Sequence, residues 1–153
     1  MKKILASILV ITVICCLCLT SCTSISRNEA EALLKDFFTA LVAEDYETAA
    51  SYMHPAANVD ADSLRTTIET MEEQMMCDFS DGFELGSCTY LYASANFNTN
   101  GISGAYNALS MNHEVKIGTK SFILDSSVIG DTNGITVGGF RLGIRSSVSN
   151  EEV

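Results

Sequence analysis

Basic residues are scarce in this sequence, and their scarcity limits the partners that the protein can have. Nine Lys and Arg stand against nineteen Asp and Glu, which gives a formal net charge of −10. Because an acidic surface repels polyanions, the composition argues against binding to nucleic acid and against electrostatic adhesion to anionic lipid.

The short motifs that identify common enzymes and metal centres are also missing. The sequence has no P-loop, no nucleophile elbow and no H-E-x-x-H. Beyond Cys22 it has no C-x-x-C pair and no zinc-ligand spacing (Cys15 and Cys18 have the C-x-x-C spacing, within the apolar N-terminal run), and His54 and His113 are its only histidines. We therefore predict no catalytic residue, no cofactor and no metal from motifs.

The N-terminus resembles an export signal. Lys2 and Lys3 precede a mainly apolar run over residues 4–19, which is short for a membrane-spanning helix of about 20 residues. The run ends in Leu19-Thr20-Ser21-Cys22, which looks like the lipobox of bacterial lipoproteins: an aliphatic residue, two small residues and a cysteine. The alternative is an uncleaved N-terminal anchor with an incidental cysteine.

The lipobox divides the chain. Residues 1–21 would be removed as a signal peptide, and Cys22 would carry two acyl chains, which is enough for stable attachment to a membrane. Residues 22–25 would be a short lipidated tether on the extracytoplasmic face. Loss of Lys2 and Lys3 changes the net charge from −10 to −12, so the lipid on Cys22 must anchor the protein alone. The 132 residues that remain suit one domain.

The cysteines have different expected roles. Three of the six leave with the signal peptide, and Cys22 takes the lipid. Cys77 and Cys88 remain in an oxidising compartment, where a disulfide can persist. A bridge would close a loop of about a dozen residues and stabilise the fold by roughly 3 kcal/mol. The alternative is two separate buried thiols.

A long helix is predicted directly after the tether. Ser26 and Glu29 form a capping-box pattern, and Glu31 precedes Lys35 by four residues, which is typical of an exposed ion pair. The apolar residues recur at helical spacing along one face: Ala30, Leu33, Leu34, Phe37, Phe38, Leu41 and Val42.

Two shorter helices are predicted next. Asp45 can cap the first, which Pro55 ends because the residue before proline disfavours helix. Asp62 can cap the second. Their inner faces carry apolar residues: Tyr46, Ala49, Ala50 and Met53 in the first, and Leu64, Ile68, Met71 and Met75 in the second.

Four strands are predicted after the helices, over residues 83–97, 105–117, 121–129 and 135–144. Turns are predicted at residues 98–101, 118–119 and 131–134, which are rich in Asn, Asp and Gly. The Gly138-Gly139 pair indicates a bulge or sharp bend. Helices followed by an antiparallel meander predict an α+β domain over residues 26–145, with one long and two shorter helices on a sheet of four or more strands. A polar tail follows at residues 146–153.

Residues 30–53 resemble the opening of the nuclear-transport-factor-2-like superfamily, also described as a cystatin-like α+β cone. Members of that superfamily begin with a long helix, an acidic-aromatic step (here Glu44-Asp45-Tyr46) and a short Ala-rich helix, before a curved antiparallel sheet. The order of elements matches over most of residues 26–144. Small lipoproteins that carry this domain are familiar from Gram-positive bacteria. The resemblance implies a sheet wrapped around the long helix, with a pocket at the open end of the cone.

Some members of that superfamily are enzymes, such as ketosteroid isomerases and dehydratases, which use Asp, His and Tyr in the pocket. Many others only bind or dimerise. This chain has no recognisable copy of the enzymes' catalytic set, so no catalytic residue is transferred to it.

Four side chains are nevertheless candidates for a pocket: Tyr46, Tyr52, His54 and His113. Either tyrosine could pair with His113 across a cavity and polarise a carbonyl. The alternatives are structural: Tyr46 as a core residue, His54 as a hydrogen-bonding helix end, and His113 as a satisfied strand histidine.

The sequence thus predicts a lipid-anchored, non-enzymatic domain at the cell surface. We expect it to bind a small apolar ligand or a partner protein, or to pair with a second copy through its sheet. A small pocket enzyme of the isomerase or dehydratase kind is the alternative.

Overall fold

The computed structural model describes residues 25–93, 97–99, 102–104, 106–131 and 133–144. The predicted signal peptide, the lipid-bearing Cys22 and the polar tail lie outside these ranges, as do parts of the turns predicted at residues 98–101 and 131–134. No helix within the described ranges is long and apolar enough to cross a membrane.

The architecture is α+β, with the helices first in the chain. Helices α2 (Arg27–Val42), α3 (Tyr46–Ser51) and α4 (Ala61–Met75) precede the strands, and single 3₁₀ turns occupy Pro55–Ala57 and Phe79–Asp81. This order confirms the prediction of one long helix and two further helices ahead of an antiparallel sheet. Helix α4 is as substantial as α2, with 15 residues against 16.

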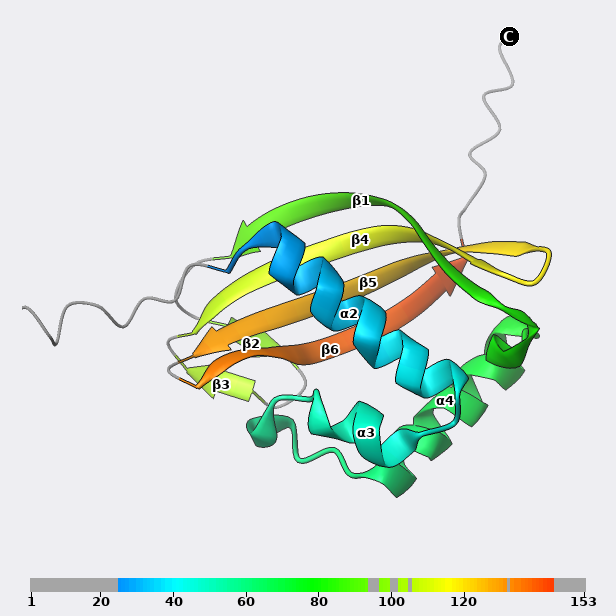
Figure 1. Ribbon diagram of the computed structural model, residues 1–153, viewed down its shortest axis with the longest axis horizontal. Helices are drawn as coiled ribbons and strands as arrows, with labels where there is room; N and C mark the ends of the chain where they lie inside the picture. The colour runs from blue at the N-terminus through cyan, green and yellow to red at the C-terminus, as the bar shows by residue number, and fades with distance from the viewer. Residues whose placement is uncertain (1–24, 94–96, 100–101, 105, 132, 145–153) are drawn as a thin grey trace, which may run out of the picture.

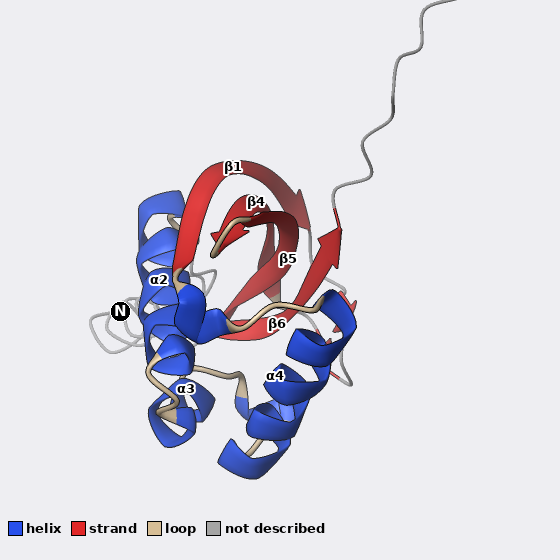
Figure 2. Cartoon of the chain, turned by 90° about the vertical axis from the view of Figure 1, so that its right-hand side faces the viewer, coloured by secondary structure: helices blue, strands red, loops and turns tan. Residues whose placement is uncertain are grey.

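The sheet is antiparallel and has four strands, β1 (Phe83–Ala93), β4 (Asn107–Ile117), β5 (Lys120–Asp131) and β6 (Gly134–Ile144), in the order β1-β4-β5-β6. A separate hairpin pairs β2 (Phe97–Thr99) with β3 (Ile102–Gly104). The predicted first strand over residues 83–97 is therefore too long, because it merges β1 with β2. Figure 1 shows α2 lying across one face of the curved sheet, and Figure 2 shows α4 towards its β6 edge.

Helix α2 buries the face that its sequence predicts. Leu34, Phe37 and Phe38 are among the most buried large side chains of the protein. The Phe38 ring stacks on Phe83 of β1 with centroids 4.7 Å apart, and it meets Phe140 of β6 edge-on. One helix thus ties together both edges of the sheet.

The N-terminal cap of α2 differs from the prediction. Ser26 does occupy the N-cap position, but its side chain makes no capping hydrogen bond. The predicted pair of Glu31 with Lys35 is also wrong, because Glu31 is half-buried and accepts a hydrogen bond from the hydroxyl of Tyr90 in β1. Packing on the sheet therefore overrides the local pattern.

The N-terminal cap of α3 was predicted correctly, and that of α4 was not. The Asp45 carboxylate accepts from the Thr48 backbone N–H at 3.1 Å, as predicted. Helix α4 is capped by Asp60 rather than by Asp62. Asp60 accepts from the Ser63 N–H at 2.8 Å, and the Ser63 hydroxyl accepts from the Asp60 N–H at 3.0 Å. This reciprocal capping box satisfies two amide groups at once.

Two bulges shape the sheet. Ser127 pairs with Gly139 while Val128 pairs with Val137, so Gly138 is an extra residue in β6, as the Gly pair predicts. A second irregularity lies in β1 between Leu85 and Cys88, where the chain has Gly86, and we did not predict it from the sequence. After this shift Cys88 lies directly opposite His113 of β4.

The space between the helices and the sheet is filled by apolar side chains. The largest of those that are almost completely buried come from helices α2 and α4 and from strands β4 and β5. They include Phe37, Phe38, Leu34, Leu41, Leu64, Ile68, Leu109, Met111 and Leu124. A close-packed interior of this kind stabilises the fold.

Candidate functional site

A trough runs across the face of the sheet opposite α2. Its volume is about 570 Å³. The residues that line it form three neighbouring cross-strand rows. The middle row, Tyr90, Met111, Ser126 and Phe140, has its side chains on the α2 side, and the two flanking rows have theirs in the trough, because side chains alternate between the two faces of a strand. Of the flanking rows, the first is Thr89, Asn112, Asp125 and Arg141, and the second is Leu91, Ser110, Ser127 and Gly139.

The first row is a hydrogen-bonded polar ladder. The Asn112 side-chain amide donates to Asp125 at 2.5 Å, and the Arg141 guanidinium binds the other oxygen of that carboxylate at 3.0 Å. Both residues of the ion pair are well exposed, so the pair adds little to stability. Its effect is to hold a positive and a negative group in fixed positions along one wall of the trough.

The second row forms the hollow because most of its side chains are small. Ser110, Ser127 and Gly139 leave space above the backbone of three adjacent strands. Leu91 stands at the β1 end of this row and is 70 % exposed. The trough therefore combines an apolar wall, a polar floor and a charged wall.

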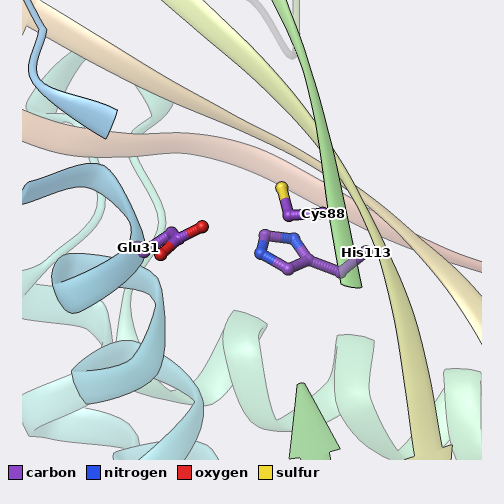
Figure 3. A group of neighbouring side chains, drawn as sticks. All are labelled: Glu31, Cys88 and His113. Atoms are coloured by element: carbon purple, nitrogen blue, oxygen red, sulfur yellow. The ribbon is translucent and has the colours of Figure 1, made fainter. Parts of the chain in front are cut away.

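A second group of polar side chains lies on the covered face, under the first turns of α2. Glu31, Cys88 and His113 bring a carboxylate, a thiol and an imidazole within 4.8 Å of one another (Figure 3). The Tyr90 hydroxyl donates to Glu31, and the Arg27 guanidinium lies 4.7 Å from the centre of the Tyr90 ring. Each of these residues comes from α2, β1 or β4, so tertiary packing alone assembles the group.

Burial and hydrogen bonding favour the uncharged forms of three side chains in this region, His113, Cys88 and Tyr90. Burial lowers the pKa of His113, an effect that the nearby Glu31 only partly offsets. Burial likewise raises the pKa of the Cys88 thiol. The hydrogen bond to Glu31 raises the pKa of Tyr90 to about 12. At neutral pH these three groups are therefore an imidazole, a thiol and a phenol.

The four predicted pocket residues do not share one cavity. Tyr46 packs in the core and under the Arg65 guanidinium, 5.2 Å away, and burial raises the pKa of its hydroxyl. Tyr52 is half-buried, and its carbonyl accepts from Val137 of β6. His113 belongs to the group beneath α2. Neither tyrosine pairs with His113, so the carbonyl-polarising arrangement is not formed.

His54 has a structural role. Its Nδ1 accepts from the Ala56 backbone N–H at 3.1 Å, and its Nε2 faces the Asp131 carboxylate at 3.6 Å. The ring also meets Tyr106 edge-on at 5.2 Å. Because both nitrogens face groups of the protein itself and the residue is only 5 % exposed, His54 closes the α3 end against β5 and β6. The sequence predicted a hydrogen-bonding side chain at the C-terminal end of the preceding helix, but His54 instead caps the following 3₁₀ turn by accepting from a backbone N–H.

The disulfide that the sequence leaves open is not formed. Cys77 and Cys88 both carry free thiols, and each is half-buried. Cys77 follows α4, and its backbone N–H donates to the Glu72 carbonyl. Burial also raises the pKa of the Cys77 thiol. The structure therefore agrees with the alternative, in which Cys77 and Cys88 are two separate thiols.

Comparison of this chain with protein-family models, with curated proteins and with solved structures finds no match. Its function must therefore be argued from its own geometry.

Sequence reasoning missed both groups of residues. The trough depends on which small residues align across four strands, and the covered group depends on the bulge before Cys88. The one signal available in the sequence was the odd parity of His113 with Met111 and Val115, which places His113 on the covered face. Nothing in the sequence indicated that Glu31 and Cys88 would join it.

Proposed function

We propose that this protein is a bacterial lipoprotein, anchored through Cys22 on the extracytoplasmic face of the membrane, whose nuclear-transport-factor-2-like domain binds a partner protein through the exposed face of its sheet. The trough on that face carries the proposal. This trough has an exposed apolar wall at Leu91 and an ion pair between Asp125 and Arg141. Such a mixture suits an extended polypeptide segment better than a purely apolar ligand.

Two observations support protein binding over the other candidates. The interior between α2 and the sheet is packed with side chains such as Phe37, Leu109 and Leu124, which leaves an apolar ligand without an obvious site there. An isomerase-like or dehydratase-like pocket would need Asp, His and Tyr around one cavity, and Tyr46, Tyr52, His54 and His113 have separate surroundings. A non-enzymatic binding domain is therefore the function that this geometry favours.

Site-specific photo-crosslinking in membranes of the native host tests the proposal. A photoreactive residue at Leu91 lies in the trough, and one at Ile144 is the control, because both residues are 70 % exposed but Ile144 does not line the trough. We expect a discrete crosslinked product from position 91 only. Ser110→Arg should block it by filling the trough, whereas Ser121→Arg, on an exposed residue outside the trough, should not. Equal crosslinking at both positions would contradict the proposal.

A second copy of this chain is the other candidate partner for the same face. The trough is open, and the same sheet face on two copies of the chain can form a symmetric interface about a two-fold axis. Light scattering of the purified lipoprotein in detergent distinguishes the cases. A dimer that Ser110→Arg dissociates and Ser121→Arg preserves would assign the trough to self-association, whereas a monomer would assign it to a different protein.

A further inference from the structure

The group beneath α2 contains an imidazole with an unfilled hydrogen-bonding position. His113 is 3 % exposed, and its Nδ1 is buried without a hydrogen-bond partner. A buried polar atom without a partner is unfavourable, because it has lost its contacts with water and gained nothing in return. Figure 3 shows this ring next to the Cys88 sulfur, with the Glu31 carboxylate on its α2 side.

The three side chains around this position are good ligands for a transition metal. Imidazole nitrogen, cysteine sulfur and carboxylate oxygen are the donors that Zn²⁺ takes in proteins, and three protein ligands leave a fourth position open. The ligand atoms of Glu31, Cys88 and His113 lie within 4.8 Å of one another. Around a tetrahedral zinc ion such atoms are about 3.5 Å apart. Side-chain rotations that draw the three atoms together by roughly an ångström would complete the geometry.

The surroundings hold these donors in place. Tyr90 donates its hydroxyl hydrogen to Glu31, which orients the carboxylate, as outer-sphere partners do in metal sites. Tyr90 itself is held by the Arg27 guanidinium over its ring. Cys88 and His113 are direct cross-strand neighbours in β1 and β4, so the sheet fixes two of the ligands rigidly.

Cys88 could instead be a nucleophile beside His113 and Glu31, but its surroundings do not favour the thiolate. A nucleophilic cysteine needs a lowered pKa, whereas burial raises the pKa of Cys88 and the thiol donates to the Thr89 carbonyl at 3.5 Å. A divalent cation supplies what is missing, because its two positive charges balance the Glu31 carboxylate and a Cys88 thiolate.

We propose that Glu31, Cys88 and His113 form a binding site for a divalent transition-metal ion, with Zn²⁺ as the ion that the donor set fits best. Binding replaces the Cys88 S–H bond with a sulfur–metal bond and releases the thiol proton to solvent. No electron is transferred. The site is independent of the trough, which lies on the other face of the sheet.

Titration of the full chain in detergent with Co²⁺ and Zn²⁺ tests this site. Co²⁺ should give a thiolate-to-metal absorption band at one equivalent, and Zn²⁺ should abolish it by displacement. Cys88→Ser should remove the band. His113→Gln and Glu31→Gln should weaken Zn²⁺ binding by about 10-fold or more. Cys77→Ser is the matched control, because it removes a half-buried free thiol elsewhere, and it should leave the band unchanged.

Alkylation of the unmodified protein covers the case in which a variant does not fold. Peptide mass spectrometry follows the reaction of each thiol with N-ethylmaleimide, with and without Zn²⁺. We expect Zn²⁺ to slow the reaction of Cys88 at least about 10-fold and to leave that of Cys77 unchanged. Equal protection of both thiols, no protection of Cys88, or a Co²⁺ band that survives Cys88→Ser would each overturn the proposal.

Discussion

Single carboxylates determine where the helical segments begin. Asp45, Asp60 and Asp78 each accept a hydrogen bond from a backbone N–H two or three residues further on. The hydroxyl side chains of the same partner residues and, second, these backbone N–H groups favour the ionised carboxylate, so the pKa of each residue lies below its ordinary value. The stability that these three caps give to the helical segments therefore depends on pH.

We predict that Asp60 contributes to acid sensitivity and Asp62 does not. Because the pKa of Asp60 is lower in the folded chain than in the unfolded chain, its contribution to stability is present above about pH 4 and is lost as the pH falls through the folded pKa. Asp60→Asn keeps a capping side chain without the charge. Urea unfolding between pH 7 and pH 3 should therefore show a smaller loss of stability in Asp60→Asn than in the wild type.

Asp62→Asn is the control for that measurement. The Asp62 side chain is 91 % exposed, and its carboxylate forms an i,i+3 contact with Arg65 at 3.6 Å. Its stability profile should follow that of the wild type. Equal acid profiles for Asp60→Asn and the wild type would show that the cap is not the origin of the dependence.

Helix α2 is the element on which the packing of the fold depends. Its Phe38 contacts Phe83 and Phe140, which lie on the two edge strands of the sheet. The loss of this ring should therefore affect the whole sheet rather than one strand.

Phe38→Ala should reduce the free energy of unfolding by about 3–5 kcal/mol, since it removes a large buried ring and leaves a cavity. Denaturant unfolding of the purified protein measures the change. Lys35→Ala, on the exposed side of the same helix, should change stability by no more than about 0.5 kcal/mol. A similar effect from the two substitutions would contradict the packing described for α2.

A single substitution, at Gly138, also tests the β6 bulge. A Cβ atom on Gly138 would lie 2.5 Å and 2.8 Å from the side-chain carbons Cδ1 and Cγ1 of Ile129, which is itself buried. Gly138→Ala should therefore destabilise the protein by about 1–3 kcal/mol. At Gly143 the nearest atom would be 3.8 Å away, so Gly143→Ala should be close to neutral in the same thermal or urea unfolding assay.

Across the whole molecule, the acidic charge and the proposed lipid anchor would act in opposite directions at a membrane. A net charge of −10, which becomes −12 if Lys2 and Lys3 are removed, repels anionic lipid. The lipid proposed at Cys22 must overcome that repulsion. Since α2 begins at Arg27, the proposed tether of residues 22–25 would be short enough to hold the domain close to the bilayer.

Cys22→Ala should accumulate as a full-length precursor that incorporates no labelled fatty acid, because only a cysteine can form the thioether to diacylglycerol. Metabolic labelling followed by gel electrophoresis measures both properties. Cys18→Ala should be processed and labelled like the wild type. Labelling of Cys22→Ala at the wild-type level would reject the proposed lipobox.

The sequence by itself determined the features that depend on local periodicity and backbone chemistry. Helical spacing from Ala30 to Val42 predicted α2 and its buried face, and the Gly138-Gly139 pair predicted the β6 bulge. Alternation in β4 predicted that Met111 and Val115 would be buried. Neighbouring residues are enough to fix such features, because the period of 3.6 or 2 residues decides which side chains share a face.

Only the tertiary structure decided which distant residues meet. The β1 irregularity places Cys88 opposite His113, and the packing of α2 brings Glu31 to Tyr90, 59 residues further along the chain. The same strand register aligns the small residues of the trough. A shift of one residue in register would turn Cys88 or Ser110 to the other face. Local patterns leave that register undetermined, and the packing of the whole domain sets it.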